Sequence, residues 1–344
     1  MDIPLTLETK AFLLSVGSAA VDPSLIPPTR KSTAGPGAGT NGSVFFRSGE
    51  KRVRLTVSPD SPLSVRALDE TENGNQKVAA IYENEIVATG FLEKPGAHCP
   101  KQAYINISEK CIYDCKYCSV PKIAGKTKTK EEVLRIAAEV WESEPFEAVS
   151  LTSGVAVSPE QELENVLAVL PELRKYNVPI GVSVYPVKDA SARLKKAGVS
   201  EIKYNLESPD KKIFEKVCPG LSYADIMNAL RDAVSHFGKG NVFTNMIVGL
   251  GETDDAVRER LEELAEAGVI ADIRPIAENP LRKGECLMER PDAERLLVLY
   301  AIQAEIYRKY GLRPDLSKTM CAKCGGCDLV CFTDGEKTDT GDGE

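Results

Sequence analysis

The residues best suited to chemistry in this chain are its cysteines, of which there are ten among 344 residues. Seven of them fall into two short segments with the patterns C-x3-C-x2-C and C-x2-C-x2-C-x3-C: Cys111, Cys115 and Cys118, then Cys321, Cys324, Cys327 and Cys331. Outside small secreted domains, thiols this closely spaced more often hold a metal centre than a disulfide framework. Only two histidines exist, His98 and His236, which largely excludes histidine-based zinc or haem sites.

The first segment carries one cysteine fewer than an iron–sulfur cubane usually takes. The thiolates of Cys111, Cys115 and Cys118 can hold three irons and leave the fourth iron with an open coordination position. This pattern predicts a bound substrate at the fourth iron. The alternative is a zinc site completed by a distant Cys or His, because structural zinc takes four protein ligands.

The second segment has ferredoxin-type spacing, in which the first three cysteines hold one cubane and the fourth usually ligates another. Only one such run exists here. It predicts an auxiliary 4Fe-4S cluster on Cys321, Cys324, Cys327 and Cys331, or on three of them with a distant ligand or an open iron. The spare thiols are Cys99, Cys218 and Cys286. A zinc-binding or purely structural segment is the alternative.

The composition sets the context for these sites. Lys and Arg number 43 against 51 Asp and Glu, a net charge of −8, which makes the chain a poor candidate for binding a nucleic-acid backbone. No apolar run approaches the roughly 20 residues needed to span a bilayer. We therefore expect a soluble, cytoplasmic protein that binds neither nucleic acid nor membrane.

Strand-like and helix-like segments alternate from Ala103 onward. Apolar runs predict strands at 103–107, 148–152, 180–185, 201–206, 242–248 and 270–276, and amphipathic stretches predict helices at 130–142, 160–176, 188–197, 222–237, 253–267 and 291–310. Six such units predict an α/β fold with a parallel sheet, either doubly wound or a partial (β/α)6 TIM-like barrel. Periodicity alone does not separate these two.

The two ends of the chain have a different character. Residues 1 to about 60 are expected to be irregular, with a flexible linker over 32–42, and 62–93 alternate around Asn73-Gly74 as in a β hairpin or meander. We divide the chain into an N-terminal β extension over 1–95, a barrel over 96–310 and a cluster-binding tail over 311–344. The acidic end of that tail is expected to be disordered.

The first cysteine pattern resembles the signature of the radical S-adenosylmethionine (SAM) superfamily, C-x3-C-x-Φ-C after the first strand, with Tyr117 as the aromatic residue. The resemblance covers about 100–310 and favours the partial barrel. It implies a 4Fe-4S cluster on Cys111, Cys115 and Cys118, whose fourth iron is chelated by SAM. It also implies a reductant such as ferredoxin or flavodoxin, and cleavage of SAM to methionine and a 5′-deoxyadenosyl radical.

Three further segments are similar to SAM-binding motifs of this family. Asn205 and Glu207 match a fourth-strand Asn-Leu-Asp segment, with Glu207 in place of the Asp that approaches the ribose. A fifth-strand glycine motif is matched by Ile247, Gly249 and Gly251, with Asn245 in place of its first glycine. Where the family carries Gly-Gly-Glu, this chain has Thr152, Ser153 and Gly154.

Several other residues lie where barrel active sites form or beside the cysteines. Tyr185, Lys203 and Arg274 sit near predicted strand ends and could anchor the SAM carboxylate or a substrate carbonyl. His98 is expected in a surface loop, with cluster ligation as the alternative. His236 is expected to stabilise a helix end.

Two cysteine clusters on a biotin-synthase-like core imply sulfur insertion into an unactivated C–H bond. The nearest resemblance is to the two-component lipoyl synthases, which implies an octanoyl group on a lipoyl-carrier protein and a sister radical SAM protein as partners. The chain lacks the N-terminal cysteine triad and C-terminal Arg-Ser-Ser-Tyr of single-chain lipoyl synthases. The alternatives are peptide or cofactor modification with the auxiliary cluster in electron transfer, and a non-catalytic iron–sulfur or zinc protein.

Overall fold

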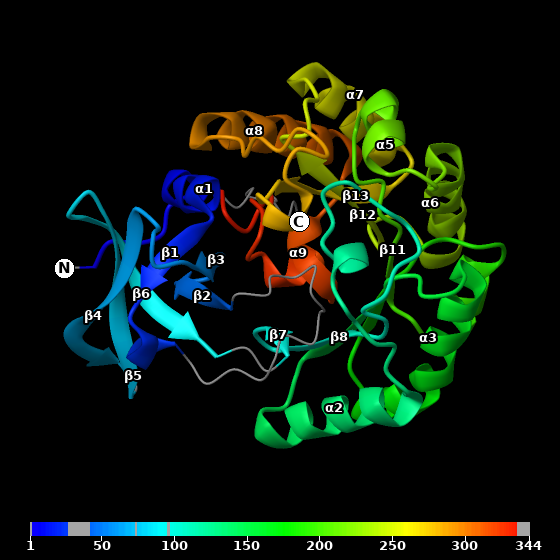
Figure 1. The fold of residues 1–344 in the computed structure, drawn as a ribbon, viewed down its shortest axis with the longest axis horizontal. Helices are drawn as coiled ribbons and strands as arrows, with labels where there is room; N and C mark the ends of the chain where they lie inside the picture. The colour runs from blue at the N-terminus through cyan, green and yellow to red at the C-terminus, as the bar shows by residue number, and fades with distance from the viewer. Residues whose placement is uncertain (1, 27–41, 73, 95–96, 336–344) are drawn as a thin grey trace, which may run out of the picture.

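The computed structural model describes residues 2–26, 42–72, 74–94 and 97–335. The linker expected over 32–42, except its last residue, and the acidic tail beyond 335 therefore lie outside the described residues. The described chain forms an N-terminal β-barrel and a larger parallel sheet with helices on its outer face (Figure 1).

The N-terminal barrel is closed and has six strands in the order β1-β3-β2-β6-β5-β4. Its elements are α1 (Leu7–Val16), β1 (Ser18–Val21), η1 (Pro23–Leu25), β2 (Ser43–Ser48), β3 (Lys51–Val57), β4 (Leu63–Glu72), β5 (Asn75–Tyr82) and β6 (Glu85–Glu93). The antiparallel pairing of β4, β5 and β6 confirms the meander expected over 62–93. Closure leaves this sheet without unpaired edges.

The expectation of irregular chain over residues 1–60 was wrong. That stretch holds α1 and three of the six barrel strands, and the buried side chains of Val53 and Leu55 alternate with Arg52 and Arg54 along β3. The strands are short and partly polar, so their apolar alternation is weak in the sequence. They are stable because the barrel closes around a shared core that no single strand can form.

The larger sheet has seven strands in the order β13-β12-β11-β10-β9-β8-β7. They are β7 (His98–Cys99), β8 (Gln102–Asn106), β9 (Ala148–Thr152), β10 (Ile180–Ser183), β11 (Glu201–Lys203), β12 (Val242–Val248) and β13 (Val269–Pro275). Strands β8 to β13 are parallel and adjacent in chain order, and β7 pairs antiparallel with β8. A doubly wound sheet would reverse its strand order partway, so the sheet is a partial barrel.

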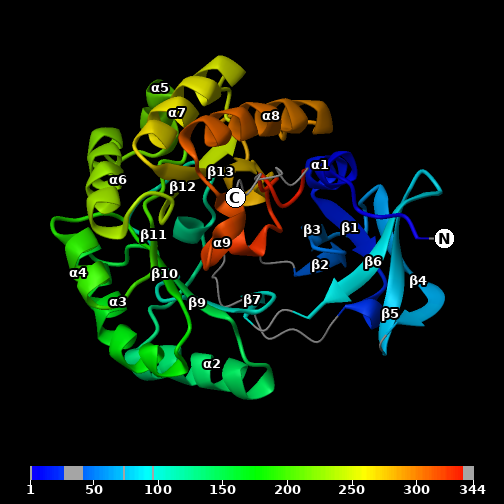
Figure 2. The same cartoon turned by 180° about the vertical axis from the view of Figure 1, so that it is seen from behind.

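Helices cover the convex face of this sheet (Figures 1 and 2). They are α2 (Lys130–Ser143), α3 (Pro159–Leu173), α4 (Ala190–Lys196), α5 (Lys211–Val217), α6 (Tyr223–Phe237), α7 (Asp254–Glu266) and α8 (Ala293–Tyr310), with 3-10 turns η3 (Val120–Lys122), η4 (Arg174–Tyr176) and η5 (Pro280–Arg282). All the predicted helices are present, and α5 is an additional one. None of the helices in the described part of the chain is long and apolar enough to cross a membrane.

The C-terminal segment passes inside the partial barrel. It comprises η6 (Pro314–Leu316) and α9 (Met320–Cys324), and both ribbon views place α9 between the N-terminal barrel and the parallel sheet. A Cβ atom on Gly181 of β10 would lie 2.1 Å from Thr319 Oγ1, so only glycine at this position admits the segment.

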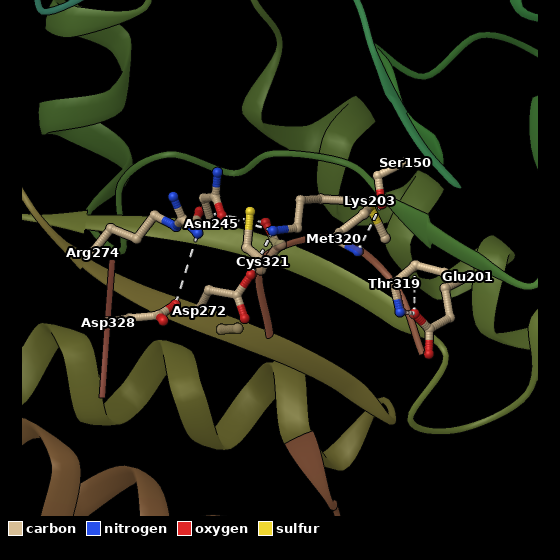
Figure 3. A network of polar contacts seen from close by, with 12 residues as sticks. Ser150, Glu201, Lys203, Asn245, Asp272, Arg274, Thr319, Met320, Cys321 and Asp328 are labelled. Carbon is tan, nitrogen blue, oxygen red and sulfur yellow. Dashed lines mark hydrogen bonds and ion pairs between the residues drawn. The ribbon is translucent and has the colours of Figure 1, made fainter. Parts of the chain in front are cut away.

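Buried polar groups of the sheet hold this segment in place (Figure 3). The Glu201 carboxylate accepts hydrogen bonds from Lys318 N–H at 2.8 Å and from Thr319 N–H and Oγ1 at 2.8 and 2.6 Å. Ser150 Oγ accepts from Met320 N–H at 2.9 Å, and Gln102 Nε2 donates to Met320 O at 3.0 Å. Strand side chains thus satisfy the backbone polar groups of this segment, which lies where apolar side chains fill an ordinary barrel.

Candidate active site

The first cysteine segment forms a loop after β8, at the carboxyl ends of the parallel strands, and its three thiols are half-buried. Two backbone hydrogen bonds tie it to neighbouring loops. Ile112 N–H donates to Val155 O and Lys116 N–H donates to Val217 O, each at 2.7 Å. We call residues 111–118 the first cysteine loop.

Side chains from the region after β13 hold the end of this loop. Arg282, which is fully buried, donates from Nε to Cys118 O at 2.7 Å and pairs with the Asp114 carboxylate at 2.7 Å. Asn279 Nδ2 donates to Tyr117 O at 2.9 Å. Contacts from three separate parts of the barrel therefore fix the loop before any cluster is bound.

The surroundings of the loop favour protonated thiols. Burial raises the pKa of Cys111, and burial raises the pKa of Cys118 to about 12. A hydrogen bond with Cys218, together with burial, raises the pKa of Cys115 as well. Thiolate is the metal-binding form, so cluster assembly here must release protons.

A cavity of about 380 Å³ opens beside the first cysteine loop. Its wall contains the three loop cysteines and residues from the carboxyl ends of several parallel strands. Nine of the residues predicted to bind SAM or its carboxylate group line it: Tyr117, Thr152, Ser153, Gly154, Tyr185, Lys203, Asn205, Glu207 and Arg274. The tertiary structure thus gathers most of the predicted site in one place.

The fifth-strand motif does not reach this cavity. Ile247, Gly249 and Gly251 are absent from its wall. The Glu252 carboxylate instead accepts hydrogen bonds from Gly249 N–H at 2.7 Å and Leu250 N–H at 2.9 Å. A Cβ atom on Gly249, whose φ is +103°, would lie 2.2 Å from Glu289 O. In this structure the motif therefore forms a tight turn.

The segment after β9 is also held by a residue that the sequence analysis missed. Ser153 Oγ donates to the buried carboxylate of Glu162 at 2.6 Å, and the same carboxylate accepts from Ala156 N–H at 3.1 Å. A Cβ atom on Gly154 would lie 2.4 Å from Lys110 O, so this glycine lets the first cysteine loop approach β9. Glu162 follows a helix start, where an acidic residue gives no distinct signal in the sequence.

Glu207 stands at the cavity wall in a left-handed backbone conformation, with φ of +65°. Its N–H donates to Asn245 O at 2.9 Å and its carbonyl accepts from Ile247 N–H at 2.7 Å, which fixes this backbone between two strands. Burial raises the pKa of Glu207 to about 7, and a hydrogen bond from Tyr117 opposes that rise. A strained residue held this firmly is typical of a functional site.

Two buried amide oxygens in the cavity wall have no hydrogen-bond partner, Asn106 Oδ1 and Asn205 Oδ1. Buried polar atoms are nearly always hydrogen-bonded, so these oxygens fit a ligand that brings hydrogen-bond donors. SAM carries an ammonium group and ribose hydroxyls that suit them. Within the described ranges no three Cys, His, Asp or Glu side chains surround a single metal ion, whereas in a cubane each thiolate binds a different iron.

The C-terminal cysteine segment, Cys321–Cys331, also reaches this cavity. Cys321 and Cys327 line the wall together with the loop cysteines, while Cys324 and Cys331 do not. Cys331 is fully buried, and its thiol donates to Gln303 Oε1 of α8 at 3.3 Å. The structure therefore brings some but not all of the predicted second-cluster thiols to this cavity.

Charged side chains lie next to Cys321 of the C-terminal cysteine segment (Figure 3). The buried Lys203 ammonium contacts the Asp272 carboxylate at 2.5 Å and Asn245 Oδ1 at 3.0 Å. Burial favours neutral Lys203, but the nearby Asp272 carboxylate and Cys321 thiol act together against it, and the pKa of Lys203 is raised. Arg274 lies 3.9 Å from the buried carboxylate of Asp328. Both cations thus already have protein counter-ions next to the cavity.

Residues near β7 and β8 complete the wall in a way the sequence did not predict. His98 was expected in a surface loop, but it is half-buried in the cavity wall, and its ring meets that of Tyr104 at 5.2 Å. Burial lowers the pKa of His98 to about 3, so the imidazole is neutral. Arg54 reaches the wall from the N-terminal barrel. Nothing in a local pattern links these residues to the site.

Comparison with known proteins agrees with this geometry. The family model described as "Radical SAM superfamily" matches residues 105–265. A ribosomal protein uS12 methylthiotransferase RimO from Alkaliphilus oremlandii is 23% identical over 246 residues, which cover 66% of this chain and 54% of that protein. A biotin synthase from Syntrophotalea carbinolica is 28% identical over 231 residues, covering 63% of this chain and 66% of that protein.

Among solved structures, Streptococcus suis SuiB bound to S-adenosylmethionine has a similar fold, with a TM-score of 0.52 and 13% identity. The match covers 61% of this chain and 48% of SuiB. The chain thus spans about half to two thirds of the length of these relatives. The family match, the three-cysteine loop after the first parallel strand and the partial barrel agree, and this part of the chain is similar to the radical SAM superfamily.

Proposed function

We propose that this radical SAM enzyme inserts sulfur into an unactivated C–H bond and that its C-terminal cysteine segment holds an auxiliary 4Fe-4S cluster. One observation carries the proposal: Cys321 and Cys327 line the same cavity as Cys111, Cys115 and Cys118. A substrate between two clusters would have a SAM-derived radical on one side and a sulfide source on the other. The similarity to a biotin synthase and a methylthiotransferase supports this reading.

In this proposal the first cysteine loop and the cavity wall bind SAM. Cys111, Cys115 and Cys118 hold the cluster, and Asn205 and Glu207 accept hydrogen bonds from the ribose hydroxyls. Thr152, Ser153 and Gly154 lie beside the SAM ammonium group, and Tyr185 packs at the cavity wall. When bound, the reduced cluster supplies the electron that cleaves SAM.

The auxiliary cluster, when bound, supplies sulfide. The role of the chain is to keep that cluster dry and close to the substrate. Buried groups of the sheet fix the start of the segment at Thr319 and Met320. We further propose an octanoyl group on a lipoyl-carrier protein as substrate, ferredoxin or flavodoxin as reductant, and a sister radical SAM protein as partner.

A second candidate is oxidative modification of a peptide or cofactor, with the auxiliary cluster carrying an electron away. The similarity of fold to SuiB, whose structures include one bound to the precursor peptide SuiA, supports this second candidate. It differs from sulfur insertion in its product, because it removes hydrogens and adds no sulfur.

The test is anaerobic reconstitution followed by reaction with SAM, dithionite and an octanoyl-lysyl peptide. We expect 5′-deoxyadenosine, a product heavier by sulfur, and a matching loss of acid-labile sulfide. A Cys324→Ala variant should still form 5′-deoxyadenosine but add no sulfur. Multiple turnovers with no loss of sulfide would contradict sulfur donation, and a product lighter by two hydrogens would favour the second candidate.

A control separates both candidates from a non-catalytic iron–sulfur or zinc protein. The triple Cys111/Cys115/Cys118→Ala variant should form no 5′-deoxyadenosine. If the wild-type protein also forms none under reducing conditions, the chain would be a metal-binding protein without radical chemistry.

A further inference from the structure

The thiols that ligate the second cluster can be identified from the structure, an inference that rests on the proposed function and deepens it. Ferredoxin-type spacing leaves the fourth cysteine, Cys331, without a second cluster of its own to ligate. The structure brings a different thiol to the C-terminal cysteine segment. Cys99, which is 1% exposed, lies close enough to Cys324 for that neighbouring thiol to raise the pKa of Cys99.

The position of Cys99 follows from strand register. Cys99 of β7 is paired with Gln102 of β8 across the antiparallel hairpin. Directly opposed residues project from the same face of a sheet, so the two side chains point the same way. Gln102 donates a hydrogen bond to Met320 O at the start of α9, at 3.0 Å. The same hairpin face therefore directs Cys99 toward α9.

Local backbone geometry gathers the other three thiols. Cys321 and Cys324 are three residues apart on α9 and so share one face of its single turn. Gly325, with φ of +62°, ends the helix in a left-handed conformation and turns the chain back toward Cys327. One further contact agrees: Tyr104, two residues from Gln102 on the same strand face, places its Oη 3.9 Å from Cys321 Sγ.

Cys331 points into a different environment. Its thiol donates to Gln303 Oε1, and Gln303 Nε2 in turn donates to Ala271 O at 2.6 Å. Cys331 also borders a small separate cavity with Ile270, Ala271 and Pro314, whereas Cys321 and Cys327 border the large one. It packs between α8 and β13 as a buried structural thiol.

Cations surround the four thiols gathered by the hairpin and α9. Arg52 interacts electrostatically with Cys99 and Cys324. Arg274 interacts in the same way with Cys321 and Cys327. Arg54 interacts with Cys327. Four thiolates concentrate negative charge, and buried negative charge requires compensation of this kind.

We propose that Cys99, together with Cys321, Cys324 and Cys327, ligates the auxiliary iron–sulfur cluster, and that Cys331 is not a ligand. The cluster then joins the β7–β8 hairpin of the partial barrel to the C-terminal segment, two parts of the chain more than 200 residues apart. All of its irons are bound by the protein.

The test uses the full chain in the Cys111/Cys115/Cys118→Ala background, where only the second site can hold iron. Cys99→Ala and Cys331→Ala are matched, because the two thiols are 1% and 0% exposed and each variant removes the same atom. We expect about four irons per chain in the background and with Cys331→Ala, falling to about three or fewer with Cys99→Ala. Iron, zinc and sulfide analysis and EPR of the reduced protein provide the readout.

A Cys99→Ser variant keeps the fold testable if Cys99→Ala does not fold. It should lose iron or shift the EPR spectrum of the background protein, because an oxygen ligand replaces sulfur. Full iron and an unchanged spectrum in the Cys99 variants, or equal iron loss in Cys331→Ala, would overturn the assignment. If the background protein itself binds no iron, the proposed function fails, and this differs from a misassigned ligand.

Discussion

The two cysteine segments are held in opposite ways. The first cysteine loop is exposed at one side, and backbone hydrogen bonds with Val155 and Val217 and the buried Arg282 fix it at the strand ends. The C-terminal cysteine segment lies inside the molecule. Two cations and one backbone N–H near the N-terminus donate to three successive carbonyls there: the Arg52 guanidinium to Cys324 O at 2.8 Å, the Lys10 ammonium to Gly325 O at 2.7 Å and Arg54 N–H to Gly326 O at 2.6 Å.

This difference suits two different tasks. A site that exchanges SAM at each turnover needs access, and the first cysteine loop borders a cavity of about 380 Å³. A cluster site that must stay protected needs burial, and the N-terminal barrel provides a cover for it. The barrel therefore supports the second site although only Arg54 among its described residues borders the cavity.

The largest effects should come from removing one cysteine from each segment in turn and measuring the properties of both sites. Cys115→Ala should reduce 5′-deoxyadenosine formation to background while leaving the iron of the second site in place. Cys324→Ala should halve the iron content, from about eight to about four, and leave SAM cleavage measurable. Iron analysis and chromatography of the nucleoside check both. Loss of SAM cleavage in both variants would show that the two sites do not function separately.

The second prediction concerns the ion pair that attaches the C-terminal segment to the N-terminal part of the chain. Lys10 and the Asp334 carboxylate form a buried ion pair at 2.6 Å. Lys10→Met leaves Asp334 buried and unpaired, which should lower the free energy of unfolding by about 3–5 kcal/mol. Urea denaturation measures this change.

The double variant Lys10→Met/Asp334→Leu is the control. It should recover most of the lost free energy of unfolding, because no unpaired charge remains. A Lys10→Met protein as stable as the wild type would mean that the barrel does not anchor the segment.

The third prediction concerns Arg282, which holds the end of the first cysteine loop. Arg282→Leu removes the donor to Cys118 O and should lower the free energy of unfolding by about 1–3 kcal/mol, because its other partners, Asp114 and Glu285, can be hydrated. We expect slower SAM cleavage and normal iron at the second site. Reduced iron at the second site with unchanged SAM cleavage would contradict this prediction, because Arg282 would then support the second site and not the first cysteine loop.

The smallest expected effect is on the pH dependence of stability. The pKa of Glu207 is raised by burial from 4.5 to about 7, so the folded protein keeps this proton at pH values where the unfolded chain has lost it. The resulting stabilisation is complete below about pH 4.5 and is lost as the pH rises through about 7. Glu207→Gln should remove this component, measured by denaturation of cluster-free protein at several pH values. An identical pH profile would show that Glu207 has the same pKa in the folded and the unfolded protein.

Sequence analysis predicted the parallel strands well, since each is a short apolar run between helices. It also found the residues that follow those strands, such as Asn205 and Glu207. It failed for the N-terminal barrel, whose strands are marginal until the barrel closes around them. It also placed Ile247 and Gly249 at the site, because glycines that form a tight turn and glycines that contact a ligand share one pattern.

The three-cysteine loop could be recognised from the sequence alone, because its closely spaced thiols after the first parallel strand lie within one local segment. The order of strands and helices was likewise readable from local patterns. Which thiols meet, in contrast, depends on the tertiary fold. Cys99 and Cys324 are 225 positions apart, and the register of the β7–β8 hairpin and its hydrogen bond to the start of α9 bring them together. Cys331, although only seven residues from Cys324, is carried away because the chain between them packs under α8.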